Sequence, residues 1–379
     1  MEFKKLYLML TMAVILVLAA CSGGSEEEAS TEDNASEETS TEESAGEETA
    51  DDESSEDESA DTIAYENQFE IGTGERGEEG QGTQIDETVE LPKNSDKVVI
   101  FDLGVASTFA ALDLEENIMG LPKGENNASL GNTISDVYES DEDYVNLGGL
   151  KEPDYEALAA LDPEIIMIHG RQSNSNVVGE LEKAAPNAEI IYVAADNSNY
   201  FEDVKEMTMF IGKMYDVEDK AQELVDDLDA QLSEVNEKVT AAELPMLFVQ
   251  TNGGNLSFHG VGGRYDFLYN DFGFTSAGEQ EESEEATDSH GNEISYEFIA
   301  ETNPALILLM DRGAAVSAGE DATSTDVLVN EVTSDVDAIE NDNVYELNPQ
   351  NWYLNAGGYL TALAQVQEIN EAVDAATAE

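Results

Sequence analysis

The feature that most constrains the fold is one long amphipathic segment, residues 218–242. Its apolar residues recur at spacings of three and four, and the segment contains neither Gly nor Pro. This period predicts a single continuous helix. The apolar positions are Ala221, Leu224, Val225, Leu228, Leu232, Val235 and Val239. Because short apolar runs lie on both sides of it, such a helix would join two separate lobes.

Two series of predicted strands flank this helix, with helix-period segments between the strands. The strands are predicted at residues 97–101, 117–121, 164–169 and 189–194, then at 245–252, 256–260, 306–310 and 344–347. The helices are predicted at residues 105–112, 155–161, 175–184 and 296–301. This order indicates α/β units around mainly parallel sheets. We therefore expect two lobes, residues 87–217 and 243–379, with a ligand cleft between them.

The N-terminus has the composition of a targeting segment. Lys4 and Lys5 precede an apolar run, residues 6–20, which is shorter than a bilayer-spanning helix and typical of a signal peptide. Small residues precede Cys21, the only cysteine, as in a bacterial lipobox. We expect a lipoprotein signal peptide over residues 1–20 and a lipid on Cys21 that holds the mature protein to the outer face of the cytoplasmic membrane. The alternative is an ordinary signal peptide with an incidental cysteine.

Acidic residues dominate the chain and are unevenly distributed. The 379 residues include 85 acidic and 15 basic ones, a formal net charge of −70. Between Glu26 and Asp61 there are 18 acidic residues and no basic residue, so we expect residues 21–86 to form a disordered acidic tether. From residue 62 onward the balance is 66 acidic to 13 basic residues. This charge excludes nucleic-acid binding as the main function and indicates a salt-adapted surface.

Arginine is scarce, and its positions are informative. The chain has four arginines, of which Arg171 and Arg312 follow predicted strands and Arg264 ends a Gly-rich loop after another. In open α/β sheets the carboxyl ends of the strands face the ligand crevice. Guanidinium groups bind carboxylate, phosphate or catecholate oxygens through paired hydrogen bonds. The three arginines therefore predict an anion site, the alternative being that each pairs with a neighbouring carboxylate.

Catalytic motifs are missing from the sequence. It has no Gly-x-Ser-x-Gly elbow, no P-loop, no His-Glu-x-x-His, and no cysteine after Cys21. We expect a binding protein without a permanent cofactor. An extracellular hydrolase that uses paired carboxylates stays open as an alternative, because so acidic a chain offers many such pairs.

Seven motifs, taken together and in order, resemble the ferric-siderophore substrate-binding lipoproteins of ABC importers. They are residues 98–104, 147–154, 169–172, 263–265, 289–291, 310–313 and 351–354. The resemblance runs from about Glu87 to the C-terminus and is greatest to the branch that binds catecholate siderophores such as petrobactin. It implies two Rossmann-like lobes joined by one backbone helix, the class III type of periplasmic binding protein. It also implies a monomer that delivers its ferric siderophore to an ABC permease and ATPase.

The resemblance also assigns roles to individual residues. Arg171, Arg264 and Arg312 fall on the family's basic triad around the ferric catecholate. His290 and Tyr353 fall on positions that complete the iron shell in some members when the siderophore supplies only two catechols. Fe(III) is hard and six-coordinate, so imidazole and phenolate are suitable ligands for the two open sites.

Two features complicate this assignment. Residues 279–288, directly before His290, include six carboxylates, which would be unfavourable beside an anionic ligand unless they point outward. Tyr265 and Trp352 could pack on catechol rings or could equally belong to the core. Other anionic metal chelates, such as haem, cobalamin or a ferric hydroxamate, remain alternative ligands.

A transport role also requires docking on the permease. In this family one surface glutamate of each lobe pairs with arginines of the membrane component, and the matching residues are Glu156 and Glu297. Both follow an aromatic residue and precede Asp-Pro or Asn-Pro and a predicted strand. This internal similarity indicates two related lobes.

Overall fold

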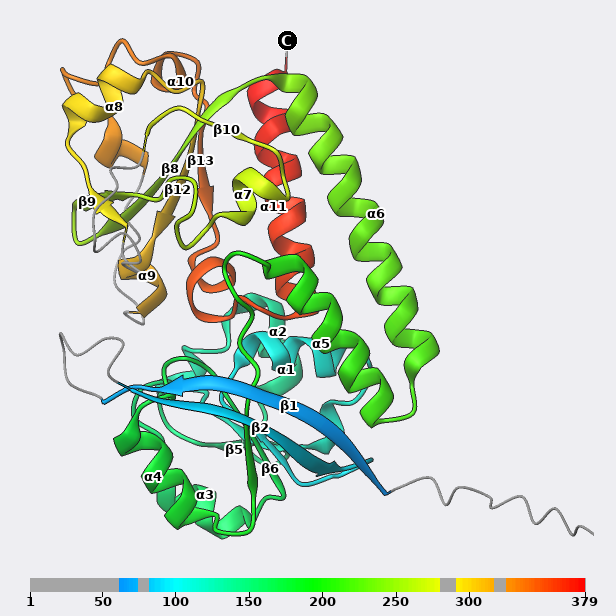
Figure 1. The fold of residues 1–379 in the computed structure, drawn as a ribbon. Coiled ribbons are helices and arrows are strands. Elements are labelled where there is room, and N and C mark those ends of the chain that lie inside the picture. Colours follow the sequence, from blue (N-terminus) through cyan, green and yellow to red (C-terminus); the bar gives the residue numbers. More distant parts are fainter. Residues whose placement is uncertain (1–60, 74–81, 280–290, 317–324, 379) are drawn as a thin grey trace, which may run out of the picture. The chain divides into compact units, whose positions relative to one another are not determined.

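The computed structural model describes residues 61–73, 82–279, 291–316 and 325–378, which all lie within one compact unit, Asp57–Glu379 (Figure 1). The predicted signal peptide, Cys21 and His290 lie outside the described residues. None of the described helices has the length and hydropathy that a membrane span requires.

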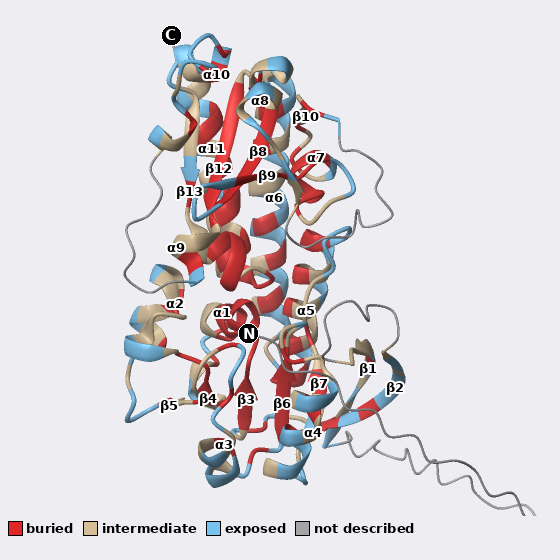
Figure 2. Cartoon of the chain, turned by 90° about the vertical axis from the view of Figure 1, so that its left-hand side faces the viewer, coloured by how far each residue is buried: buried red, intermediate tan, exposed pale blue. Residues whose placement is uncertain are grey.

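The N-terminal lobe contains a parallel five-stranded sheet in the order β5-β4-β3-β6-β7. Its central strands β3 and β6 are completely buried, as expected when helices cover both faces of a parallel sheet (Figure 2). The strands are β3 (Val98–Ile100), β4 (Ile118–Leu121), β5 (Val145–Asn146), β6 (Ile165–Ile168) and β7 (Glu189–Tyr192). The helices are α1 (Leu103–Ala111), α2 (Gly131–Tyr138), α3 (Tyr155–Leu161) and α4 (Ser175–Ala184), with short turns η1 (Glu115–Asn117) and η2 (Glu125–Asn127).

The C-terminal lobe contains a mixed sheet in the order β11-β9-β8-β12-β13, with β10 also paired to β8. Strands β8, β12 and β13 are parallel, whereas β9 is antiparallel to β8 because a tight turn with positive φ at Gly253 and Gly254 joins them. The strands are β8 (Pro245–Asn252), β9 (Asn255–Phe258), β10 (Thr275–Ser276), β11 (Asn292–Glu293), β12 (Leu306–Asp311) and β13 (Val344–Leu347). The helices are α7 (Phe267–Asn270), α8 (Tyr296–Thr302), α9 (Arg312–Val316) and α10 (Asp337–Glu340), with turns η3 (Thr325–Leu328) and η4 (Gln350–Leu354).

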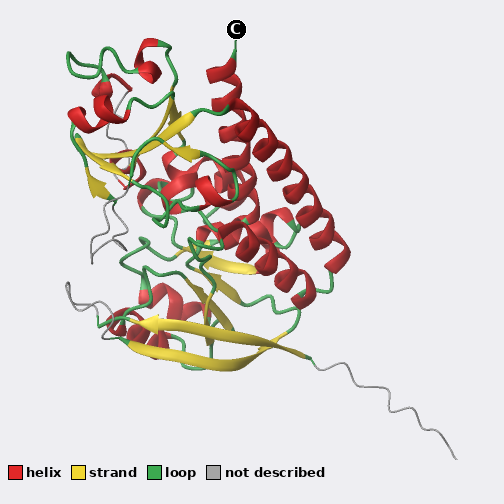
Figure 3. Cartoon of the chain, turned by 45° about the horizontal axis from the view of Figure 1, so that its top comes forward, coloured by secondary structure: helices red, strands yellow, loops and turns green. Residues whose placement is uncertain are grey.

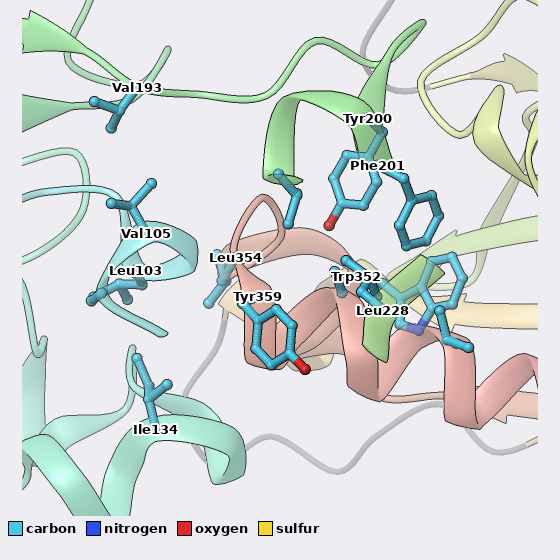
Figure 4. Close-up of a cluster of buried hydrophobic side chains, with 14 of the residues drawn as sticks. Leu103, Val105, Ile134, Val193, Tyr200, Phe201, Leu228, Trp352, Leu354 and Tyr359 are labelled. Carbon is cyan, nitrogen blue, oxygen red and sulfur yellow. The ribbon is translucent and has the colours of Figure 1, made fainter. Parts of the chain in front are cut away.

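Three further helices connect the two lobes: α5 (Tyr200–Met214), α6 (Glu218–Ala242) and α11 (Tyr359–Thr377). The prediction of one continuous helix at residues 218–242 is confirmed. Helix α11 follows the C-terminal lobe, lies beside α6 and also packs against α1 of the N-terminal lobe (Figures 1 and 3). One hydrophobic cluster therefore extends through both lobes, with side chains from α1, α5, α6 and α11 (Figure 4).

The prediction of a disordered tether was wrong for the last part of residues 21–86. An antiparallel hairpin forms there from β1 (Thr62–Ile71) and β2 (Thr83–Pro92). The Asn67 side chain docks it on β7 at the edge of the first sheet: Nδ2 donates to the Ile190 carbonyl at 3.0 Å, and Oδ1 accepts from the Tyr192 amide at 3.0 Å. Half of the 20 strand residues of the hairpin are exposed and only three are buried, so the strands tolerate an acidic composition and show no apolar run in the sequence.

Candidate functional site

Each of the three predicted arginines follows a strand, two of them at the carboxyl ends of parallel strands and Arg264 in the loop after the antiparallel strand β9. Arg171 lies in the turn after β6 of the N-terminal lobe, Arg312 begins α9 directly after β12, and Arg264 lies in the loop between β9 and α7. Both lobes therefore contribute to the cluster, as expected for a site at the crevice edge of parallel sheets.

All three guanidinium groups converge on Tyr353. The guanidinium carbons of Arg264, Arg312 and Arg171 lie 4.4, 5.1 and 5.8 Å from the centroid of the Tyr353 ring. Arg312 Nε donates to the Tyr353 hydroxyl at 2.8 Å. Arg171 Nη2 donates to the Tyr353 carbonyl at 2.7 Å, and Arg264 Nη2 donates to the same carbonyl at 3.3 Å. Residues far apart in the sequence thus form one cluster around one phenol.

The charge of this cluster acts on the Tyr353 phenol. Burial opposes its ionisation, but the hydrogen bond from Arg312 and the positive charges of all three arginines outweigh burial, so the pKa of Tyr353 lies below its ordinary value. Arg171 and Arg312 form no ion pair with any carboxylate that the structure describes. Positive charge is therefore available to an anionic ligand.

A network of hydrogen bonds holds the turn that carries Tyr353. Glu368 of α11 accepts hydrogen bonds from the Asn348 amide at 2.8 Å, from Trp352 Nε1 at 3.0 Å and from Asn351 Nδ2 at 3.3 Å. Burial raises the pKa of this carboxyl group above its ordinary value, and these donors oppose the shift. The turn η4 is thereby fixed against α11.

Tyr265 packs against Trp352, which is itself part of this turn. The Tyr265 hydroxyl donates to the Trp352 carbonyl at 3.3 Å, and both side chains are almost completely buried. Both belong to the hydrophobic core and both also line a cavity at the arginines. Packing in the core and lining the ligand cavity are therefore compatible roles for these two side chains.

Two adjoining spaces lie at the arginine cluster. The first, the arginine chamber, has a volume of about 470 Å³ and is lined by Arg171, Arg264, Arg312 and Tyr353 together with the aromatic residues Tyr192, Tyr200, Tyr265, Phe267 and Trp352. The second, the aliphatic chamber, has a volume of about 680 Å³. Apart from the residues that it shares with the first, it is lined by Ala128, Leu150, Ala314, Ala315, Val316 and Leu354, with Gly124, Glu125, Ser129 and Gln350. Lys151, Arg171, Arg312 and Tyr353 line both.

Sequence reasoning missed several residues of these chambers. Lys151 lines both chambers, and its signal in the sequence was its place in the motif of residues 147–154. His169, in the motif of residues 169–172, lines the arginine chamber. Burial and the charges of Arg171 and Arg264 hold the pKa of His169 well below its ordinary value, so its imidazole stays neutral.

A buried acid lies behind the cluster. The Asp102 carboxylate caps α1 by accepting a hydrogen bond from the Val105 amide at 3.0 Å. Burial raises the pKa of Asp102 to about 7, although the Val105 amide and the Arg171 charge oppose this shift.

The two glutamates expected to dock on the permease are both exposed, in the first turns of α3 and α8. Each helix ends at a residue with positive φ, Asp162 or Asn303, which a proline and a buried strand follow. The same local structure therefore presents Glu156 in one lobe and Glu297 in the other.

The comparisons with known proteins agree with this architecture. Residues 98–351, more than half of the chain, match the family described as periplasmic binding protein. The chain belongs to this family. This periplasmic binding protein is 32% identical over 292 residues to the petrobactin-binding protein YclQ of Bacillus subtilis, a match that covers 77% of this chain and 87% of the relative. It is 26% identical over 233 residues to the ferric-anguibactin-binding protein FatB of Vibrio anguillarum, covering 61% of this chain and 70% of the relative.

A solved structure shows the same fold. The crystal structure of YclQ aligns with a TM-score of 0.66 at 30% identity, covering 81% of this chain and 99% of that one. The predicted fold, two α/β lobes joined by a long helix, is confirmed. Periplasmic binding proteins are extracytoplasmic substrate-binding proteins of ABC transporters and not enzymes, so the hydrolase alternative is wrong.

Proposed function

We propose that this periplasmic binding protein captures a ferric catecholate siderophore in the arginine chamber and delivers it to an ABC importer. The observation that carries the proposal is the convergence of three guanidinium groups from both lobes on Tyr353. A ferric catecholate complex is an anion with closely spaced oxygen atoms, which guanidinium groups recognise through paired hydrogen bonds. The printed names of YclQ and FatB, which bind petrobactin and ferric anguibactin, support this ligand class.

Within this proposal each site residue has a defined role. Arg171, Arg264 and Arg312 bind the catecholate oxygens. Tyr353 and His290 supply two ligands to iron when the siderophore brings only two catechols. The faces of Tyr265 and Trp352 pack near the catechol rings.

The same proposal extends to the cell envelope. A lipid on Cys21, after cleavage of residues 1–20, anchors the protein to the outer face of the cytoplasmic membrane. The protein acts as a monomer, and Glu156 and Glu297 contact arginines of the permease. The equivalent exposure of these two glutamates in the two lobes supports this docking mode.

Fluorescence titration tests the ligand class, because Trp352 is the only tryptophan and lines the arginine chamber. Ferric mono-, bis- and tris-catecholates, haem, cobalamin and a ferric hydroxamate would each be titrated into the protein. We expect a ferric catecholate to quench most of the indole emission at the lowest concentration. Tighter binding of haem, cobalamin or the hydroxamate would refute the proposed ligand class.

The iron-ligand roles need a separate measurement. We expect Tyr353→Phe and His290→Ala to weaken binding of the bis-catecholate more than that of the tris-catecholate, which leaves no open iron site. Equal losses for both complexes, or no loss, would show that neither side chain binds iron.

A further inference from the structure

The aliphatic chamber differs chemically from the arginine chamber beside it. Its cationic lining residues, Lys151, Arg171 and Arg312, all lie on the wall that the two chambers share. Beyond that wall, small and aliphatic side chains from both lobes dominate the lining, including Ala128 of the N-terminal lobe and Ala314 of the C-terminal lobe. A ligand that spans both chambers would therefore meet positive charge at one end and apolar surface at the other.

Val316 presents apolar surface that the described residues leave uncovered. Its side chain is 48% exposed, and among the large hydrophobic side chains of the described ranges only Val261 and Val329 are more exposed. Leu150 and Leu354, on the same chamber, are each 9% exposed. Exposed aliphatic surface beside a ligand site typically marks part of the binding surface, because covering it removes apolar area from water.

The sizes of the two chambers also indicate that a ligand occupies the aliphatic chamber as well as the arginine chamber. The aliphatic chamber, at about 680 Å³, is larger than the arginine chamber, at about 470 Å³. A chelate head that filled only the arginine chamber would leave the larger space and its apolar wall in contact with water. A group covalently attached to the anionic head would be held beside the shared wall and could extend into the second chamber.

We propose that the aliphatic chamber binds the uncharged, methylene-rich linker that joins the chelating groups of the cargo. This inference rests on the proposed function and specifies its ligand class: a catecholate chelate with an extended aliphatic linker. A linker with added carboxylates is disfavoured, because among the described lining residues no cation lies beyond the shared wall and Glu125 adds a negative charge.

Three preformed ferric complexes with the same two catechol groups test the inference. In the first complex the catechols are not linked, in the second an unbranched polymethylene chain joins them, and in the third an oligoether chain of the same length joins them. Each buried methylene strengthens binding by about fourfold. We expect the polymethylene complex to bind at least tenfold more tightly than the oligoether complex, measured by Trp352 quenching.

Filling the chamber should remove this preference without affecting the head. Ala128→Phe places a ring in the chamber from the lobe opposite Arg312, and Ala314→Phe does so from the other lobe, so one variant serves if the other fails to fold. Either should reduce the preference to less than threefold and leave the affinity for the unlinked complex within twofold of wild type. Ala64→Phe, at an exposed position of β1, is the matched control and should keep the full preference.

The outcomes separate the two proposals. Equal binding of the two linked complexes to wild type, or a preference that survives in the filled-chamber variants, would refute the linker site while catecholate binding stands. If wild type binds none of the three complexes, the proposed function fails and the linker site fails with it.

Discussion

Replacing Arg312 by glutamine tests the arginine cluster most directly. Arg312 Nε donates to the Tyr353 hydroxyl at 2.8 Å, and its guanidinium carbon lies 5.1 Å from the ring centroid. Glutamine removes the charge and both Nη donors, whereas its amide nitrogen takes the position of arginine Nε and can still donate to the hydroxyl. The substitution therefore isolates the electrostatic contribution of one member of the cluster.

Two contributions set the expected magnitude. Opposite unit charges about 4 Å apart attract by about 4 kcal/mol at an effective dielectric constant near 20, before desolvation. Arg312 is partly exposed, which screens this attraction, and a hydrogen bond to a charged group contributes about 1.5–3 kcal/mol net. We therefore expect Arg312→Gln to weaken binding of a ferric bis-catecholate by at least about 1.4 kcal/mol, or tenfold.

The assay is Trp352 quenching, with a control that removes one positive charge elsewhere. Lys183 has a side chain that is 71% exposed and pairs with Glu180 on the surface of α4, so Lys183→Gln should change affinity by less than about twofold. A second measurement needs no ligand: loss of the Arg312 charge should raise the pKa of Tyr353 toward its ordinary value in an ultraviolet titration. Unchanged affinity in Arg312→Gln, Arg171→Gln and Arg264→Gln alike would refute the role of the cluster.

Three further predictions concern the residues that support the site. Glu368→Gln turns an amide NH₂ toward at least one of the three donors that now face the carboxylate. The free energy of unfolding should therefore fall by about 1–3 kcal/mol, and the emission of ligand-free Trp352 should shift. An unchanged spectrum and stability would contradict the anchoring role of Glu368. The raised pKa of Asp102, about 7 against 3.8, means that its contribution to stability is complete below about pH 4 and is lost as the pH rises to about 7. Asp102→Asn should make that decline shallower by up to about 1.4 kcal/mol per pH unit in urea unfolding, and parallel pH profiles of the two proteins would show that Asp102 does not titrate as inferred. The fully buried side chain of Lys123 pairs with Asp141 at 2.7 Å and donates to the Ser140 carbonyl at 2.9 Å. Lys123→Met should therefore lower the free energy of unfolding by about 1–3 kcal/mol. Unchanged stability would mean that these bonds are replaced by water.

Much of the fold follows from short-range patterns in the sequence. The helix at residues 218–242 was predictable because its apolar spacing matches the helical period over its whole length. Strands such as β6 and β12 were predictable because buried parallel strands are continuous apolar runs. The hairpin of β1 and β2 was not, because only three of its side chains are buried and it is anchored by scattered long-range contacts, such as the hydrogen bonds of Tyr65 and Asn67 to β7, that leave no periodic pattern.

The candidate site likewise has features that the sequence predicts and features that only the folded structure shows. The sequence by itself indicated that Arg171, Arg264 and Arg312 each follow a strand, because an apolar run and the residues after it are local features. Only the fold showed that β9, before Arg264, is antiparallel to its neighbour. Only the tertiary structure decided that these groups meet at Tyr353, which lies 182 residues from Arg171 and 89 from Arg264. It also decided that Glu368 anchors the turn and that a second chamber adjoins the first. Such contacts depend on how the lobes and α11 pack together, and no local pattern of residues records that packing.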